Sequence, residues 1–149
     1  MKEIILKDEH ATRDFAKKIA VDVLNKPRGG KAMILALVGD LGAGKTTFAQ
    51  AFAKALGVND RILSPTFLIF KRYAIACGGF SNFYHTDAYR IKNAAELDVL
   101  GFAQILKDQR NIVLIEWADK IKEIIPRNAL WLEFKHGNTL NERVVALQD

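Results

Sequence analysis

The chain has 149 residues, of which 50% are hydrophobic, and a formal net charge of +5. This length suits one domain around one core, so we expect residues 1–149 to fold as a single domain. Because the chain shows no signal-peptide-like or bilayer-length apolar run and has only one cysteine, we expect a soluble, cytoplasmic protein rather than a secreted or membrane-spanning one.

The excess positive charge lies in the first half of the chain. Residues 1–75 carry 13 basic and 7 acidic side chains, whereas residues 76–149 carry 9 and 10. This bias favours anionic ligands such as nucleotides or RNA. No run of Lys or Arg exceeds two residues, however, so charge alone does not argue for direct RNA binding.

The first predicted helix begins after Asp8, a suitable N-cap residue. Phe15, Ile19 and Val23 follow at helical spacing, and a Pro-Gly-rich segment at 25–30 ends the pattern. We expect this helix to pack on a sheet as part of the scaffold.

Residues 39–47, with the sequence GDLGAGKTT, fit the pattern GxxxxGK[ST] of a phosphate-binding loop. They lie between an apolar run at 31–38, predicted to be a buried parallel strand, and a predicted helix at 45–56. The glycines allow backbone N–H groups to turn towards a triphosphate, and the helix N-terminus adds its positive dipole end. In such a loop Lys45 reaches the β- and γ-phosphates, and the Thr46 hydroxyl is a ligand of Mg²⁺.

The second half of the chain alternates further strand and helix patterns. Two β-rich stretches at 67–73 and 83–85, with glycines between them, predict an antiparallel pair. A sequence resembling a capping box at 93–96 predicts a helix that Gly101 interrupts. The remaining expected strands cover residues 111–117, 129–135 and 143–147.

Polar side chains stand at the ends of these predicted strands. Thr66 precedes one strand, Asp87 follows another, and Glu116 lies at the end of a third. Phosphoryl transfer from a magnesium nucleotide needs a carboxylate near the metal, and both acids follow hydrophobic runs, so the pattern does not choose between them. Ligands of open α/β sheets bind at the carboxyl edge, where Glu116 is expected to face the phosphate loop.

The sequence also limits the choice of chemistry and base. His85 is a single histidine between a tyrosine and a threonine, a setting that is more often structural than catalytic. No second His or Cys at metal spacing accompanies it, so zinc is not indicated. The chain lacks the Asn-Lys-x-Asp sequence by which GTPases bind guanine, which leaves adenine as the base expected by elimination.

Four blocks stand in series along the chain: residues 39–47, Ser-Pro-Thr-Phe at 64–67, His-x-Asp-x-Tyr-Arg at 85–90 and Ile-Glu-Trp at 115–117. In this order they resemble the bacterial TsaE (YjeE-like) family of P-loop ATPases, from about residue 8 to residue 147. The resemblance implies a three-layer α/β P-loop NTPase fold with a mixed, mainly parallel sheet. It also implies a Mg²⁺-dependent ATPase required for threonylcarbamoylation of the adenosine beside the tRNA anticodon. The implied partners are the TsaD and TsaB proteins, with tRNA reached indirectly through their complex.

The resemblance further implies roles for single residues. Thr66 matches the switch threonine of the family, and Asp87 matches the acid near Mg²⁺. Glu116 matches an acid needed for hydrolysis, and Trp117 matches a tryptophan close to the nucleotide. The implied catalytic residues are Glu116, Lys45 and Asp87, and the implied metal ligands are Thr46, Asp87 and Glu116. The implied nucleotide contacts are Asp40, Leu41, Gly42, Ala43, Gly44, Lys45, Thr46, Thr47, Thr66 and Trp117.

Two other functions share the phosphate loop. A small-molecule kinase would need an acceptor site and an arginine-rich lid, for which the spacing of these motifs leaves little room. A nucleotide-dependent adaptor would bind ATP without hydrolysing it and use the bound state to hold a binding surface. The products formed from ATP distinguish these alternatives from an ATPase.

Overall fold

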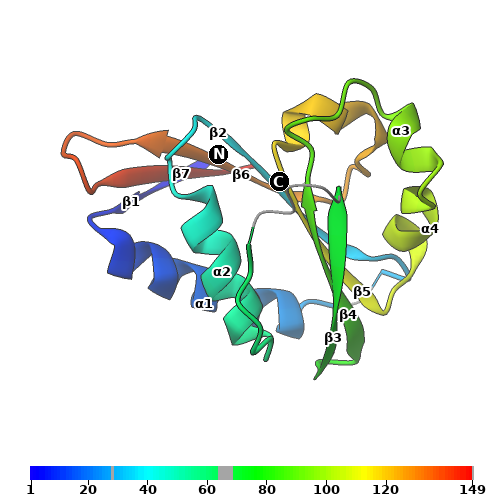
Figure 1. Ribbon diagram of the computed structural model, residues 1–149. Helices are drawn as coiled ribbons and strands as arrows, with labels where there is room; N and C mark the ends of the chain where they lie inside the picture. The colour runs from blue at the N-terminus through cyan, green and yellow to red at the C-terminus, as the bar shows by residue number, and fades with distance from the viewer. Residues whose placement is uncertain (28, 64–68, 149) are drawn as a thin grey trace.

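The computed structural model describes residues 1–27, 29–63 and 69–148, and Figure 1 shows their arrangement. Within these residues one seven-stranded sheet has helices on both faces. The strands are β1 (Lys2–Leu6), β2 (Met33–Gly39), β3 (Phe70–Cys77), β4 (Phe80–Asp87), β5 (Asn111–Glu116), β6 (Leu130–His136) and β7 (Arg143–Gln148). The helices are α1 (Glu9–Asn25), α2 (Lys45–Ala55), α3 (Ala95–Asp98), α4 (Phe102–Lys107) and the 3-10 helix η1 (Ala118–Ile124).

The sheet has a parallel centre and antiparallel flanks. Its strand order is β1-β7-β6-β2-β5-β4-β3. β2 pairs in parallel with both β5 and β6, and β4 pairs in parallel with β5. β3 runs antiparallel beside β4, and β7 and β1 extend the sheet beyond β6 through antiparallel pairs. This confirms the expected mixed α/β sheet, and it brings the carboxyl ends of β6, β2, β5 and β4 to one edge, where open sheets bind ligands.

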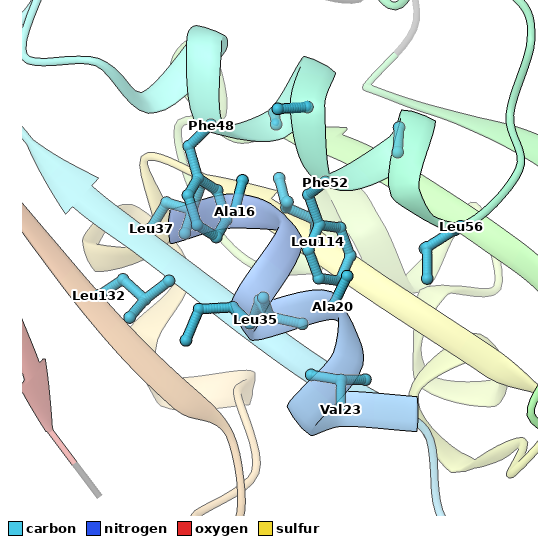
Figure 2. Packing of buried hydrophobic residues seen from close by; sticks show 14 of the residues in the cluster. Ala16, Ala20, Val23, Leu35, Leu37, Phe48, Phe52, Leu56, Leu114 and Leu132 are labelled. Atoms are coloured by element: carbon cyan, nitrogen blue, oxygen red, sulfur yellow. The ribbon is translucent and has the colours of Figure 1, made fainter. Parts of the chain in front are cut away.

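The sheet is the middle of three layers. Side chains alternate between its two faces, and each face has its own hydrophobic cluster. On one face, helices α1 and α2 cover Leu35, Leu37 and Leu114, with the rings of Phe48 and Phe52 packed between them (Figure 2). The cluster on the other face joins β2 and β5 to α3, α4 and η1 and includes Ala36, Ile115, Leu97, Phe102 and Ile121.

Both long helices form as their patterns predict. The Asp8 carboxylate accepts a hydrogen bond of 2.8 Å from the N–H of Ala11, which caps the first turn of α1. In α2, the apolar residues Phe48, Phe52 and Leu56 recur every four positions, and all three are buried against the sheet. The helix that follows the phosphate loop is therefore anchored along its length by core packing.

The structure corrects two local predictions. Strand β1 was not predicted, and it pairs antiparallel with β7, with Lys2 opposite Leu147. The expected capping box does not form, because α3 begins after Ala94 with no side-chain cap and spans four residues. Part of the stretch predicted at 67–73 lies outside the described residues, and the observed β3 begins at Phe70.

Candidate functional site

The phosphate-binding loop joins the end of β2 to the start of α2 at the carboxyl edge of the sheet. Gly39, Gly42 and Gly44 have φ angles of 138°, 75° and 104°, which L side chains rarely adopt. Gly44 is the N-cap of α2, so no side chain caps the first-turn N–H groups, and no acidic residue lies in that turn. These N–H groups and the positive end of the helix dipole are arranged to accept an anion.

Gly39 is also required by the close approach of two strands. A Cβ atom at this position would lie 2.2 Å from the backbone oxygen of Phe134 on β6. Gly39 and Phe134 are partners in the parallel register of β2 and β6. The loop therefore leaves the sheet at a point where any side chain would push these two strands apart.

Lys45 is held inside the site, with only 5% of its surface exposed. Its ammonium group donates hydrogen bonds to the backbone oxygens of Gly39 and Asp40, the latter at 2.8 Å. It also lies 4.3 Å from the centre of the Trp117 ring, a cation–π contact. Burial lowers the pKa of Lys45, and the neighbouring carboxylates, Glu116 foremost, oppose this shift.

Two carboxylates face this lysine from neighbouring strands. Asp87 ends β4 and Glu116 ends β5, and the two residues are partners in the parallel register. Glu116 is 3% exposed, and its Oε1 accepts a hydrogen bond of 3.3 Å from the Thr46 hydroxyl. Its other oxygen, Oε2, lies 2.6 Å from Nε2 of His85. The structure thus brings the two predicted acids and Thr46 to one end of the sheet.

Asp87 is the more exposed of the two acids and carries a perturbed pKa. Burial raises the pKa of Asp87, and the negative charge of Glu116 adds to that effect. A hydrogen bond of 2.9 Å from the N–H of Tyr89 to Oδ1 opposes it, as do His85 and Lys45. A cation placed beside Asp87 would favour its ionised form.

Trp117 directly follows Glu116 and has a left-handed backbone conformation, with φ 57° and ψ 40°. It is the one non-glycine residue with positive φ among the described residues. Its ring contacts the ring of Tyr89, with 4.9 Å between the two centroids. The ammonium group of Lys120 lies over the Tyr89 ring, 5.3 Å from its centroid. Strained backbone conformations of this kind cluster at functional sites, and the ring of this residue is the one that contacts the Lys45 ammonium group.

A cavity of about 350 Å³ connects these groups. It extends beyond the phosphate loop to the first turn of α1 and to the start of β7, where Thr12 and Arg143 line it. Arg143 donates hydrogen bonds to the backbone oxygens of Leu140 and Glu142 at 2.8 and 2.9 Å. The full lining comprises Glu9, Thr12, Leu41, Gly42, Gly44, Lys45, Thr46, Thr47, Asp87, Tyr89, Glu116, Trp117, Asn141 and Arg143.

The predicted contacts fall into three groups. Nine of them line the cavity: Leu41, Gly42, Gly44, Lys45, Thr46, Thr47, Asp87, Glu116 and Trp117. Two others do not, because Asp40 is exposed on the loop and Ala43 packs in the hydrophobic core. Thr66 lies outside the described residues.

The far side of the cavity was missed by sequence analysis. Thr12 sits on a helix assigned to the scaffold, although its burial at 2% exposure is unusual for a hydroxyl residue near a helix start. Glu9 and Asn141 carry no motif. Their role in the cavity depends on α1 and the β6–β7 turn folding against the phosphate loop.

The donor set at this edge suits a magnesium ion that is shared with a nucleotide. Among the described residues no group of three or more His, Cys, Asp or Glu side chains is arranged to hold a metal ion alone. The available oxygens come from Thr46, Asp87 and Glu116 beside an anion-binding loop. Mg²⁺ prefers such sites, with one or two carboxylates and phosphate oxygens completing its shell.

No helix in the described part of the chain has the length and apolar character needed to span a membrane.

Comparison with known proteins links the chain to one group of relatives. The family model for the threonylcarbamoyl adenosine biosynthesis protein TsaE matches residues 6–145. The tRNA threonylcarbamoyladenosine biosynthesis protein TsaE of Bacillus subtilis is 41% identical over 104 residues, 70% of this chain and 62% of that protein. This chain therefore spans less than two thirds of the length of that relative.

Other relatives match over more of their length. The corresponding protein of Rickettsia bellii is 36% identical over 134 residues, 89% of this chain and 85% of the relative. A crystal structure described as Bacillus subtilis YdiB superposes with a TM-score of 0.74 and 31% identity, covering 98% of this chain and 83% of that one. The matched region contains every described residue of the loop and both carboxylates. The chain belongs to the TsaE family of threonylcarbamoyl adenosine biosynthesis proteins.

Proposed function

We propose that this chain binds Mg²⁺-ATP in the cavity at the carboxyl edge of the sheet and hydrolyses it in the course of tRNA threonylcarbamoyladenosine synthesis. The observation that carries the proposal is that a phosphate loop and two strand-end carboxylates line one cavity, where the Thr46 hydroxyl donates a hydrogen bond to Glu116. A phosphate loop alone would support binding. The acids opposite it are what hydrolysis requires.

The loop and Lys45 would hold the triphosphate. The first turn of α2 has no side-chain cap, so its backbone N–H groups would donate to the phosphates, and Lys45 would supply a full positive charge beside them. In the structure the ammonium group donates hydrogen bonds to the backbone oxygens of Gly39 and Asp40 and contacts the Trp117 ring. Phosphate binding would draw the ammonium group away from these partners.

The polar side chains around Thr46 would hold the metal and the attacking water. Bound Mg²⁺ would neutralise charge that develops on the β- and γ-phosphate oxygens. Thr46 and Asp87 would contribute oxygen ligands to it, with Glu116 beside them. Glu116 would also accept a proton from, or orient, the water that attacks the γ-phosphate.

The nucleoside would occupy the part of the cavity between α1 and β7. Thr12 and Arg143 border this part beside Gly44: a Cβ atom added at that glycine would lie 3.7 Å from Cγ of Arg143 and 4.0 Å from the methyl group of Thr12. The Thr12 hydroxyl donates a hydrogen bond of 3.4 Å to the backbone oxygen of Asp8. Adenine is proposed because the guanine-binding sequence is lacking. The cavity of about 350 Å³ lies at the lower end of the size range of small-molecule sites.

The proposed partners are the TsaD and TsaB proteins, with tRNA reached through their complex. Support comes from family membership, since the relatives named above are tRNA threonylcarbamoyladenosine biosynthesis proteins. Efficient hydrolysis by P-loop proteins usually needs a positive group at the γ-phosphate, which a partner can supply. We therefore expect slow turnover by the chain alone and acceleration in the assembly.

Product analysis tests the proposal. The purified chain is incubated with Mg²⁺ and ATP labelled at the γ-phosphate, together with the variants Glu116→Ala and Glu123→Ala. Glu123 is an exposed acid of η1 that does not line the cavity, so it controls for loss of charge. The expected result is free phosphate from the parent and the control, and far less from Glu116→Ala. Label transferred to an acceptor would indicate a kinase, and ATP that is bound but never consumed, even with TsaD and TsaB present, would indicate an adaptor.

A further inference from the structure

His85 is a buried titratable side chain that the proposed reaction does not use directly. It is 1% exposed and lies near the end of β4, between Phe83 and Asp87 on the face that α2 covers. Below it Phe83 belongs to the hydrophobic cluster, and beyond it Asp87 lines the cavity. The histidine thus stands where the apolar core gives way to the polar site.

The imidazole makes its hydrogen bond to the acid proposed to act on water. Nε2 of His85 lies 2.6 Å from Oε2 of Glu116, and both side chains are almost fully buried. The second oxygen of the carboxylate, Oε1, accepts the bond from Thr46 at 3.3 Å. The two contacts tie the two oxygens of one carboxylate to different elements, β4 and α2.

We infer that His85 is a positioning residue for Glu116: its Nε2–H holds Oε2 so that Oε1 faces Thr46 and the phosphate loop. The inference rests on the proposed function and adds a residue to it. A glutamate at a strand end has several rotamers, and the single hydrogen bond of 3.3 Å from Thr46 would not by itself select one of them. A donor on the neighbouring strand does select one, because the parallel register fixes His85 opposite Leu114, two residues before the acid.

A carboxylate oxygen accepts hydrogen bonds, so Nε2 of His85 is the donor in this contact, in the tautomer that carries hydrogen on that nitrogen. Nδ1 of His85 is buried and has no hydrogen-bond partner among the described residues. A histidine kept only for the core would be expected to satisfy both nitrogens, since unpaired buried polar atoms are costly. In this ring Nδ1 is left unpaired, and Nε2 is hydrogen-bonded to Glu116.

Three substitutions separate positioning from packing. His85→Gln places an amide N–H near the position of Nε2, so it can still donate to Glu116. His85→Asn is shorter, and its amide reaches only the region of Nδ1. His85→Leu keeps apolar volume but has no donor. Urea denaturation and ADP affinity are measured for each variant, so that loss of folding or of the nucleotide site is detected separately from loss of turnover.

The expected pattern is a selective loss of turnover. His85→Leu and His85→Asn should lower the rate of phosphate release about 10- to 100-fold, the usual effect of removing a group that orients a site residue. ADP affinity should stay within about threefold, because Glu116 acts on the chemical step. His85→Gln should restore most of the rate. Equal losses in all three variants, together with lower urea midpoints, would show that the histidine only packs, and would overturn the inference.

A double-mutant comparison shows whether His85 acts through the acid. In a Glu116→Ala background, His85→Leu should cause no further loss of phosphate release. A loss in that background as large as in the parent would contradict the inference. If Glu116→Ala alone leaves phosphate release unchanged, the proposed function fails and the inference fails with it. If Glu116→Ala is slow but His85→Leu is as fast as the parent, only the inference fails.

A spectroscopic measurement tests the contact without any turnover. The chain has three histidines, and the signals of His85 in nitrogen-15-labelled protein without nucleotide are assigned by their disappearance in His85→Gln. Nε2 should carry a bound hydrogen, and its chemical shift should move in Glu116→Gln. A bare Nε2, or a shift that does not respond to the change at Glu116, would contradict the donor role.

Discussion

Replacing Lys45 by Met should weaken nucleotide binding without unfolding the protein. Methionine keeps most of the buried stem and removes only the charged donor. In the structure the ammonium group is desolvated, and its pKa is lowered by that burial. Removing it therefore removes a buried charge together with its bonds to Gly39 and Asp40, so the free energy of unfolding of the nucleotide-free protein should change little.

The expected loss of affinity follows from the bonds that the lysine would make to phosphate. Hydrogen bonds to charged groups contribute about 1.5 to 3 kcal/mol each. At about 1.4 kcal/mol per factor of ten, loss of one such bond weakens binding roughly 10- to 150-fold. The bonds that Lys45 gives up when nucleotide binds reduce the measured difference. The lower end of this range is expected for ADP, because ADP lacks the γ-phosphate that Lys45 would also contact.

Isothermal calorimetry with ADP and with a non-hydrolysable ATP analogue measures the effect. The matched control is Lys54→Met, which removes the same charge from the exposed last turn of the same helix. Urea denaturation confirms that both variants are folded. If Lys45→Met binds nucleotide as tightly as Lys54→Met, the assignment of the loop as a triphosphate site is wrong.

Three further predictions concern the edge of the sheet. Glu116→Ala should release phosphate about 100-fold more slowly or worse while its affinity for Mg²⁺-ATP changes less than about threefold, and equal losses in both measurements would contradict its role in the chemical step. Burial raises the pKa of Asp87 above its ordinary 3.8, so the folded state binds the carboxyl proton more tightly than the unfolded state does. The folded state therefore loses stability as the pH rises from the ordinary pKa through the raised pKa of Asp87. Asp87→Asn should therefore raise the urea midpoint of the nucleotide-free protein at pH 7, with no gain below about pH 4, and a lower midpoint at pH 7 would refute the sign. The same variant should shift the Mg²⁺ dependence of turnover to higher Mg²⁺ concentrations, because a proposed ligand is lost. Gly39→Ala should destabilise the protein more than Gly57→Ala, because a Cβ atom at residue 39 would lie 2.2 Å from the Phe134 oxygen, whereas one at residue 57 would meet nothing within 4 Å. Gly57→Ala is expected to cost about 1 to 2 kcal/mol through its positive φ alone. Equal losses of unfolding free energy in the two variants would contradict the close approach at Gly39.

Local patterns predicted the elements that carry the phosphate loop. The apolar run before Gly39 and the four-residue spacing in α2 are strong signals, because the middle of β2 is buried and α2 buries one face against the sheet. Strand β1 gave no such signal. It has five residues, only Leu6 is fully buried, and its partner β7 lies at the opposite end of the chain. Pairing over that sequence distance cannot be inferred from a window of a few residues.

The site divides in the same way. Lys45, Thr46, Asp87 and Glu116 were predicted because each stands at the end of an element with a clear pattern, and the parallel register then brings them together. The contact between His85 and Glu116 joins residues 31 positions apart and depends on the register of β4 against β5. The sequence alone favoured a structural histidine. The nucleoside side of the cavity depends in turn on how α1 and β7 pack beside the loop.

The most direct test of the central claim is the amount of threonylcarbamoyladenosine formed on tRNA in a reconstituted reaction. The reaction contains TsaD, TsaB, a supply of the threonylcarbamoyl donor, ATP and either the parent chain or Glu116→Ala, with the chain present at a small fraction of the tRNA concentration. If ATP hydrolysis at this cavity is what the chain contributes, the parent should support many rounds of modification, and Glu116→Ala, although it binds ATP, should support few. Equal amounts of modified tRNA with both proteins would contradict the account and favour an adaptor that uses bound ATP without hydrolysing it.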